Sequence, residues 1–231
     1  MIDNEELRRR FCPEGSALRR QQMRMLELLE AVDGVCKRHS IPYWLSSGTL
    51  LGAARHHGFI PWDDDLDIEM LREDYLRLVK VLPGELPGRF ALQTHETDPN
   101  YIFTYGKLRD KDSYLAEPNR YDRDWKYRGI YIDIFVLERI PLPLAWVAGH
   151  MQGQIYNQLN SKTLSENCIS RRVQRIFRFN EHIGFPILRF LSRLVPGTPL
   201  RHTFGTPYFK PRYDFPALGN GVRGQDVPRP P

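Results

Sequence analysis

The sequence predicts an α/β (α+β) protein, in which helices flank a mixed β-sheet and a helical accessory region follows. Two observations support this class. Helix-prone and strand-prone segments alternate from about residue 16 to Phe135, and apolar residues make up 41% of the 231 positions. Such alternation is typical of helices packed on a sheet, and the apolar content supports a sizeable core. We expect a core over residues 1–140, helices over 141–196 and a Pro/Gly/Arg-rich, disordered tail over 197–231.

The first half of the chain predicts two helices around a short strand. An amphipathic helix is expected over residues 16–39, ended by Ser40-Ile41-Pro42. Its apolar positions recur at intervals of three, four and seven residues: Leu18, Met25, Leu29, Val32 and Cys36. Residues 43–47 form a β-prone run, and residues 50–56 a compact helix-forming segment. A further helix is expected over residues 72–81, closed by Pro83-Gly84.

The second half predicts strands and then helices. Strand-like runs occupy residues 90–93, 101–108, 114–116 and 128–136. We expect a polar turn at residues 111–113 to join residues 105–110 to 114–116 as a hairpin. From residue 141 to about 195 apolar residues follow a helical pattern.

The most informative segment is Trp-Asp-Asp-Asp-Leu-Asp-Ile at residues 62–68. In a strand, alternation would project Asp63, Asp65 and Asp67 to one side. Three like charges on one face repel each other unless protons or a cation neutralise them. Oxygen ligands at this density suit Mg²⁺ or Mn²⁺ rather than zinc. A solvated acidic turn is the alternative, which the apolar flanks disfavour because they place the charges near a core.

A small-residue turn precedes this acidic segment. Gly48 and Thr49 stand between the β-prone run and the helix start. A strand, a small-residue turn and a helix start form a phosphate site, because free backbone N–H groups and the helix dipole face the anion. Arg55 and His56 end the predicted helix and could bind the same phosphate or order the loop, while Arg55 could equally form a salt bridge to the acidic strand.

The block from Tyr43 to Asp67 resembles the LicD/fukutin family almost continuously, through Ser47-Gly48-Thr49-Leu50-Leu51-Gly52-Ala53 and Gly58-Phe59-Ile60-Pro61-Trp62-Asp63-Asp64-Asp65. The resemblance implies a nucleotidyltransferase-like fold. It also implies metal-dependent transfer of a phospho-alcohol, such as phosphocholine, from a CDP-alcohol donor to a sugar hydroxyl. The acceptor would be a cell-surface glycan or its precursor, as in lipopolysaccharide biosynthesis. The resemblance does not identify the alcohol.

The resemblance assigns roles to particular residues. Asp63, Asp65 and Asp67 would hold the metal, with Asp65 and Asp67 as catalytic carboxylates. Nucleotidyltransferase folds carry a third acidic residue on a neighbouring strand, and Asp133 matches it best, although it could instead be a hydrogen-bonding group at a strand end. Gly48, Thr49, Arg55 and His56 would bind the donor. Lys107 and Arg109, two positions apart, would either bind substrate or form a solvated hairpin face.

Charge and cysteine content bear on partners and location. A net charge of +5 suits an anionic substrate, a nucleic acid or an anionic membrane surface. The three cysteines, Cys12, Cys36 and Cys168, lack metal-ligand spacing. They indicate reduced thiols in a cytoplasmic protein. A lipid-linked acceptor would place that protein at the inner face of the membrane. We expect neither a secretory signal nor a transmembrane helix.

The arginine-rich stretch over residues 171–193 has two interpretations. It could be a pair of membrane-surface helices that contact an anionic membrane. Ordinary accessory helices with their arginines in water are the alternative, which we favour. The expected partners are therefore a CDP-alcohol donor and a sugar or lipid-linked glycan acceptor, with peripheral membrane contact as an option and no nucleic acid.

Four other functions are considered. A calcium loop is excluded, because its sixth position is Ile68 where glycine is needed and its twelfth is Asp74. A metal-dependent glycosyltransferase also holds a nucleotide diphosphate with an Asp-x-Asp motif. A nucleic-acid binder could use the basic C-terminal half. The C-terminus departs from the LicD/fukutin pattern, so an inactive family member acting as a binding protein is a further alternative.

Overall fold

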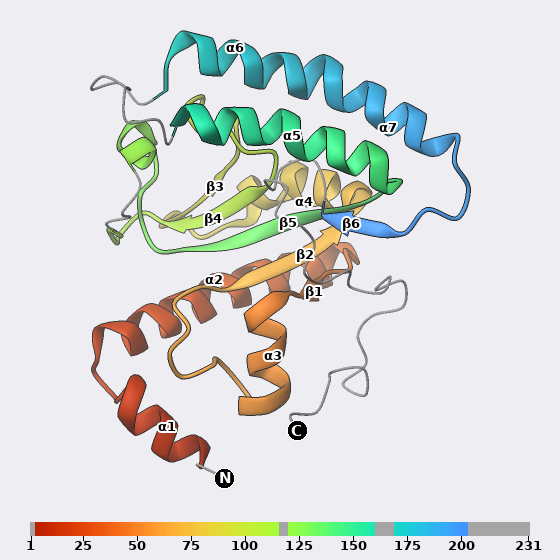
Figure 1. Ribbon diagram of the computed structural model, residues 1–231. Helices are drawn as coiled ribbons and strands as arrows, with labels where there is room; N and C mark the ends of the chain where they lie inside the picture. The colour runs from red at the N-terminus through yellow and green to blue at the C-terminus, as the bar shows by residue number, and fades with distance from the viewer. Residues whose placement is uncertain (1–2, 116–119, 160–168, 203–231) are drawn as a thin grey trace.

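The computed structural model describes residues 3–115, 120–159 and 169–202, and within them six strands form one mixed sheet (Figure 1). The strand order is β1-β2-β5-β4-β3, and β6 pairs with the far end of β5. Strands β2 and β5 are parallel, and all other pairs are antiparallel. The strands are β1 (Trp44–Leu45), β2 (Asp67–Leu71), β3 (Phe90–Gln93), β4 (Gly106–Asp110), β5 (Tyr131–Arg139) and β6 (Leu200–His202). The predicted fold class is confirmed.

Helices surround the sheet in the described part of the chain. They are α1 (Asn4–Phe11), α2 (Ala17–His39), α3 (Ser47–His56), α4 (Arg72–Glu85), α5 (Leu142–Leu159), α6 (Arg171–Phe179) and α7 (Phe185–Arg193). A 3₁₀ turn, η1, covers Arg120–Asp124, and a π turn, η2 (Asn180–Gly184), joins α6 to α7. The predicted helix over residues 16–39 is confirmed as α2. The Ser16 side chain accepts a hydrogen bond from the Arg19 N–H at 3.1 Å, which caps its first turn.

The main core lies between one face of the sheet and helices α2 and α4. It contains Met25, Leu28 and Val32 of α2 with Leu78 and Leu82 of α4, packed on sheet residues Ile68, Met70, Leu108, Ile132 and Ile134. Because side chains alternate along a strand, Asp67 in β2 and Asp133 in β5 project from the opposite face. Burial of the apolar set against α2 and α4 therefore determines which face carries the carboxylates.

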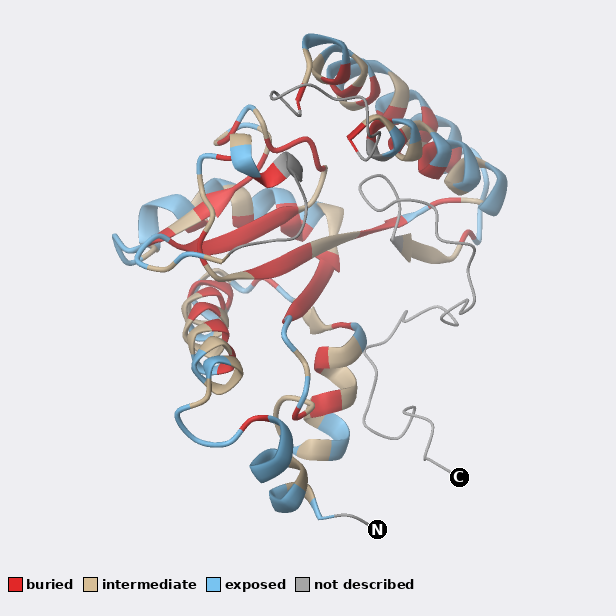
Figure 2. Cartoon of the chain, turned by 60° about the vertical axis from the view of Figure 1, so that its left-hand side comes forward, coloured by how far each residue is buried: buried red, intermediate tan, exposed pale blue. Residues whose placement is uncertain are grey.

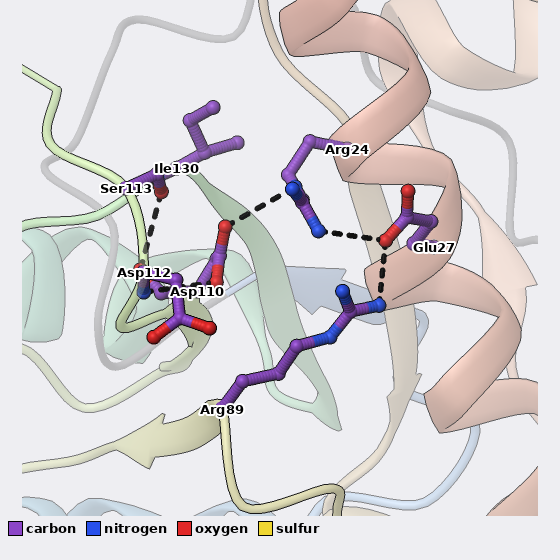
Figure 3. Close-up of polar contacts among 7 residues, drawn as sticks. All are labelled: Arg24, Glu27, Arg89, Asp110, Asp112, Ser113 and Ile130. Carbon is purple, nitrogen blue, oxygen red and sulfur yellow. Dashed lines mark hydrogen bonds and ion pairs between the residues drawn. The ribbon is translucent and has the colours of Figure 1, made fainter.

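Ion pairs join α2 to the end of the sheet formed by β3 and β4 (Figure 3). The Arg24 guanidinium contacts Glu27 at 2.8 Å and the buried Asp110 at 3.2 Å. Arg89, just before β3, donates to the same Glu27 carboxylate at 2.6 Å. The Asp110 carboxylate also accepts from the Asp112 N–H at 3.1 Å. These contacts fix α2 against the strands that it covers.

Helices α5, α6 and α7 lie above the sheet in Figure 1 and again in Figure 2, with α1, α2 and α3 below it. A second core joins α5 and α6 to the segment before β4. It contains Tyr101, Ile102, Phe103, Trp125, Ile155, Leu159, Ile169, Val173 and Phe177. No helix in the described residues combines the length and hydropathy needed to cross a bilayer.

Two of the expected strands differ from the structure. Residues 114–115 form no strand, and β4 pairs with β3 and β5 instead of closing a hairpin over residues 105–116. Residue 116 lies outside the described part. Residues 63–66 are irregular, and β2 begins only at Asp67. Both errors arise because strand pairing depends on distant partners that the local pattern does not reveal.

Two boundaries also differ. Helix α4 continues through Pro83 to Glu85, four residues past the expected end, with the Leu86 N–H bonded to the Leu82 carbonyl at 3.1 Å. Strand β6 lies within the range expected to be a disordered tail, and it pairs with Leu137–Arg139 of β5. The rest of that tail, residues 203–231, lies outside the described residues, as does Cys168. Cys12 and Cys36 are buried free thiols.

Candidate active site

Asp67 and Asp133 lie side by side on the polar face of the sheet. They are direct partners in the register of the parallel strands β2 and β5, and each is about nine-tenths buried. The Asp133 N–H donates to the Leu66 carbonyl at 2.9 Å, which holds the two strand starts together. In a parallel pair, partner residues project to the same side of the sheet. Two carboxylates from segments far apart in sequence therefore meet at one point.

The acidic side chains affect each other's protonation. Burial, together with the neighbouring charges of Asp133, Asp65 and Asp63, raises the pKa of Asp67 to about 8, and Lys107 opposes this rise. Burial and the adjacent Asp65 raise the pKa of Asp63 to about 6. Asp65 itself is exposed. Repulsion among these carboxylates is relieved either by protons or by a cation.

Lys107 and Arg109 are both buried on this face of the sheet, so the predicted alternative, in which they form a solvated hairpin face, is wrong. The Lys107 ammonium donates to Asp133 Oδ1 at 2.6 Å and lies 3.4 Å from the centre of the Tyr131 ring. Arg109 donates to Gln93 Oε1 and to the Gly129 carbonyl, each at 2.8 Å. Lys107 therefore belongs to the carboxylate site, whereas these bonds give Arg109 a structural role beneath it.

The first turn of α3 is bonded to the start of β2. The Asp67 N–H donates to Thr49 Oγ1 at 2.9 Å, and the Ser46 N–H donates to the Asp67 carbonyl at 3.0 Å. Gly48 and Thr49 thus lie inside the first helical turn, where N–H groups have no carbonyl partner within the helix. A Cβ at Gly48 would lie only 2.8 Å from Asp63 Oδ2. The predicted anion cradle is therefore adjacent to the acidic segment.

Arg55 and His56 lie at the opposite end of α3. Eight residues separate Gly48 from His56, a rise of about 12 Å along a helix. The His56 ring pairs with the Asn4 side chain at 2.7 Å, and Arg8 donates to the His56 carbonyl at 2.9 Å. Burial, with Arg8 and Arg55 nearby, lowers the pKa of His56. The structure thus brings the end of α3 against α1.

Comparison with known proteins adds a second line of observation. A family model described as the LicD/FKTN/FKRP nucleotidyltransferase domain matches residues 40–189, well over half of the chain. The chain belongs to this family. The matched range contains the α3 cradle, the acidic segment and strand β5 with Asp133. The resemblance inferred from residues 43–67 is therefore confirmed.

Individual relatives within the LicD/FKTN/FKRP family share shorter segments. The lipopolysaccharide cholinephosphotransferase LicD of Haemophilus influenzae is 35% identical over 125 residues, which is 54% of this chain and 45% of that protein. The ribitol 5-phosphate transferase FKRP of Homo sapiens is 48% identical over 48 residues, 21% of this chain and 10% of that protein. An uncharacterized protein of Rickettsia prowazekii is 42% identical over 64 residues, which is 28% of this chain and 24% of that protein. The chain spans less than half the length of each.

Sequence reasoning missed two residues on the polar face of this LicD/FKTN/FKRP domain. Glu69 follows Asp67 by two positions in β2, is buried, and accepts a hydrogen bond from Ser46 Oγ at 2.8 Å. Tyr131 precedes Asp133 by two positions in β5 and lies against both Lys107 and Arg109. The signal was present, because alternation from Asp67 and Asp133 points to these positions.

The carboxylates suit a divalent cation in their chemistry. They supply only oxygen donors, which Mg²⁺ and Mn²⁺ prefer. Asp63 Oδ2 is buried and has no hydrogen-bond partner among the described residues. Burial and repulsion between the carboxylates raise the pKa of Asp63 and of Asp67, and a bound cation would relieve the repulsion. Across the described ranges, however, no three His, Cys, Asp or Glu side chains converge closely enough to form a metal site by themselves.

Proposed function

We propose that this chain transfers a phospho-alcohol group, such as phosphocholine, from a CDP-alcohol donor to a sugar hydroxyl of a cell-surface glycan or its precursor. One observation carries the proposal: Asp67 and Asp133 are register partners on parallel strands, directly beside the first turn of α3. Family membership supports it, as do the activities for which two relatives are named, a cholinephosphotransferase and a ribitol 5-phosphate transferase.

The proposed reaction breaks the bridging P–O bond of the donor and forms a new P–O bond to the acceptor hydroxyl. CMP leaves with the electron pair of the broken bond. A divalent cation held by Asp67, with Asp63 and Asp65, would offset charge on the donor phosphates and on the leaving CMP. The free N–H groups of Ser47, Gly48 and Thr49 would bind a phosphate at the positive end of α3.

Asp133 is the group we assign to the acceptor. Its carboxylate would accept the proton of the attacking sugar hydroxyl as a general base. Burial raises the pKa of Asp133, and Lys107 and Arg109 oppose that rise by favouring the ionised form. Lys107 also fixes the carboxylate through the 2.6 Å contact. We assign the chain to the cytoplasmic face of a membrane, where a lipid-linked glycan acceptor would be available.

A ligand screen tests this proposal. Melting temperature and CMP release are measured with CDP-choline, CDP-ethanolamine, CDP-ribitol and CDP-glycerol, each with Mg²⁺ or with EDTA. UDP-glucose and GDP-mannose serve as nucleotide-sugar comparators. We expect at least one CDP-alcohol to stabilise the protein in Mg²⁺ only and to release CMP when a glycan acceptor is added.

The matched variants are Asp65→Asn and Asp64→Asn, because both carboxylates are exposed neighbours on the same segment. Asp65→Asn should suppress Mg²⁺-dependent stabilisation and CMP release, whereas Asp64→Asn should retain them. Stabilisation by a nucleotide sugar in place of every CDP-alcohol would instead favour a glycosyltransferase. A parent protein indifferent to Mg²⁺ with every CDP-alcohol would overturn the proposal.

A further inference from the structure

The outer side of α6, η2 and α7 carries a row of large apolar side chains in solvent. Phe179, Ile183, Ile187, Phe190 and Leu194 are each between 49% and 64% exposed. They recur at intervals of three and four residues, which places them along one side of a helix. The opposite side is buried against α5 and its surroundings by residues that include Val173, Phe177, Phe185 and Leu188.

This row follows one side of the helices from Phe179 to Leu194. Figure 2 shows exposed ribbon along the outer edge of α6 and α7 and buried ribbon on the edge facing α5. Singly exposed apolar residues are normal on protein surfaces, whereas a contiguous apolar surface marks an interaction site. Both core clusters that contain α6 and α7 lie on the buried side, so the exposed row does not contribute to the core.

Exposed arginines accompany the apolar row. Arg171, Arg172, Arg175 and Arg178 are exposed on α6, and Arg193 is exposed at the end of α7. Glu181 is the one acidic residue in the sequence from Arg171 to Val195. Arg189, by contrast, is directed inward and contacts Glu138 at 2.9 Å. The result is an apolar row with cations at both ends and little opposing charge.

We infer that this α6–α7 face, formed by the five apolar residues with Arg172, Arg175 and Arg193, lies on the surface of a bilayer that contains anionic phospholipids. An apolar row flanked by arginines is the pattern of a helix that lies in the membrane interface. Anionic headgroups attract the arginines while the apolar side chains enter the region below the headgroups. A second copy of the chain is disfavoured, because a symmetric contact would bring the two sets of arginines together.

The inference goes beyond the proposed function, and binding to lipid does not depend on transfer activity. Only its consequence rests on that function: the bilayer would hold the chain beside a lipid-linked acceptor. The helices lie on the membrane without crossing it, since exposed arginines run along α6 and no described helix is both long and apolar enough to cross a bilayer. Ordinary accessory helices with solvated arginines are the alternative that the vesicle experiment distinguishes from this inference.

Vesicle sedimentation tests the inference with the full chain. Vesicles of phosphatidylcholine alone are compared with vesicles that also contain phosphatidylglycerol, and neither contains a glycan acceptor. We expect at least about tenfold tighter binding to the anionic vesicles, weakened by added salt because the attraction is partly electrostatic. Equal binding to both vesicle types, or none to either, would overturn the inference.

Two sets of variants separate the apolar and the charged contributions. Ile187→Ser with Phe190→Ser should reduce vesicle binding by about tenfold or more, since apolar area no longer enters the bilayer. Arg172→Gln and Arg175→Gln should each weaken binding by about fivefold. The controls are Leu76→Ser and Lys80→Gln, which change exposed residues of α4. The controls should bind as the parent does, and circular dichroism checks that every variant is folded.

Two further measurements separate lipid binding from transfer activity and from self-association. Asp67→Asn should bind vesicles like the parent, so loss of transfer activity and loss of lipid binding can be told apart. Light scattering gives the oligomeric state in the absence of lipid. A dimer that Ile187→Ser converts to monomer, together with unchanged vesicle binding in that variant, would assign the face to a second copy and overturn the membrane inference.

Discussion

The Lys107 ammonium lies 2.6 Å from Asp133 Oδ1, across the antiparallel pair of β4 and β5. The two residues are register partners, and both are at least nine-tenths buried. On its other side, Asp133 is the register partner of Asp67 in β2. One buried ammonium therefore contacts this group of carboxylates directly, with the Arg109 guanidinium buried on the same face.

Removing that cation should destabilise the protein strongly. Lys107→Met keeps the length of the side chain and leaves Asp133 as an uncompensated buried charge. We expect the free energy of unfolding to fall by about 3–5 kcal/mol at neutral pH, the usual cost of breaking a buried pair. Urea denaturation monitored by circular dichroism measures the change.

Two controls accompany that variant. Adding Asp133→Asn to Lys107→Met should restore most of the lost stability, because the double variant no longer buries an unpaired charge. Lys37→Met breaks the 2.6 Å contact with Asp33 in α2, where the lysine side chain is 77% exposed. This change should cost about 1 kcal/mol or less. Equal losses for Lys37→Met and Lys107→Met would contradict a buried pair.

The stability of the metal-free protein should depend on pH through Asp67. Its pKa is about 8 in the fold, against an ordinary value of 3.8. Between those values the folded protein holds a proton that the unfolded chain has released, so the free energy of unfolding should decrease as pH rises from about 4 to about 8. Denaturation midpoints in EDTA across this range measure the slope.

Asp67→Asn is the variant that isolates this contribution. Asparagine has nearly the same size and does not titrate, so the decrease between about pH 4 and pH 8 should become shallower. At pH 8 the variant should be as stable as the parent or more stable, since one repelling charge is gone. If the parent's stability instead rises over this range with the same slope as that of Asp67→Asn, Asp67 holds no extra proton in the fold and the prediction is wrong.

Two glycines of α3 should respond differently to the same substitution. In Gly48→Ala the new methyl group meets only the end of the Asp63 side chain, at 2.8 Å, which can rotate away. We expect stability to change by about 1 kcal/mol or less and CDP-alcohol affinity to fall by about tenfold or more, because the methyl group occupies the anion cradle. Thermal melting and ligand titration measure the two effects.

Gly52→Ala is the matched control in the same helix. Its methyl group would lie 2.6 Å from the Gly58 carbonyl oxygen and 2.8 Å from the Ile60 nitrogen, both backbone atoms. Backbone cannot move aside as a side chain can, so this change should cost about 1–3 kcal/mol of stability. If Gly48→Ala proved as destabilising as Gly52→Ala, its effect on donor binding could not be assigned to the cradle.

The hydroxyl of Thr49 lies at the candidate site and should also stabilise the fold. It accepts the Asp67 N–H at 2.9 Å, and Thr49→Val would leave that buried donor without its partner. We expect a loss of about 1–3 kcal/mol in the free energy of unfolding. Thr49→Ser retains the hydroxyl and should restore most of it. Urea denaturation of both variants measures the difference. Equal stability of Thr49→Val and Thr49→Ser would show that this hydrogen bond does not contribute to stability.

Much of the fold was accessible from local patterns. The helix over residues 17–39 follows from its apolar period and its Ser16 cap, both of which are local. The hairpin expected at residues 105–116 was wrong, because a turn-like sequence and two β-prone runs do not specify which strands pair. In the structure β4 lies between β3 and β5. That pairing depends on burial of the shared core under α2 and α4.

The candidate site shows the same division. The two-residue spacing of Lys107 and Arg109 correctly predicts that they share one face. The same spacing leaves open whether their side chains contact water or substrate, and it does not predict their burial. Burial against Tyr131 and Trp125 depends on segments that lie distant in sequence. Arg55 and His56 are close to Gly48 in sequence, but the rise of α3 separates them from it.

The sequence by itself determined the oxygen-rich donor set, the small residues at the start of α3 and the family to which the chain belongs. Tertiary structure alone decided that Asp67 meets Asp133 directly, that Lys107 neutralises part of their charge, and that none of the described residues covers the apolar side of α6 and α7. The physical reason is the distance along the sequence over which each interaction acts. Local patterns report the periodicity and chemistry of neighbouring residues, whereas register, burial and charge pairing depend on contacts between segments brought together only when the core forms.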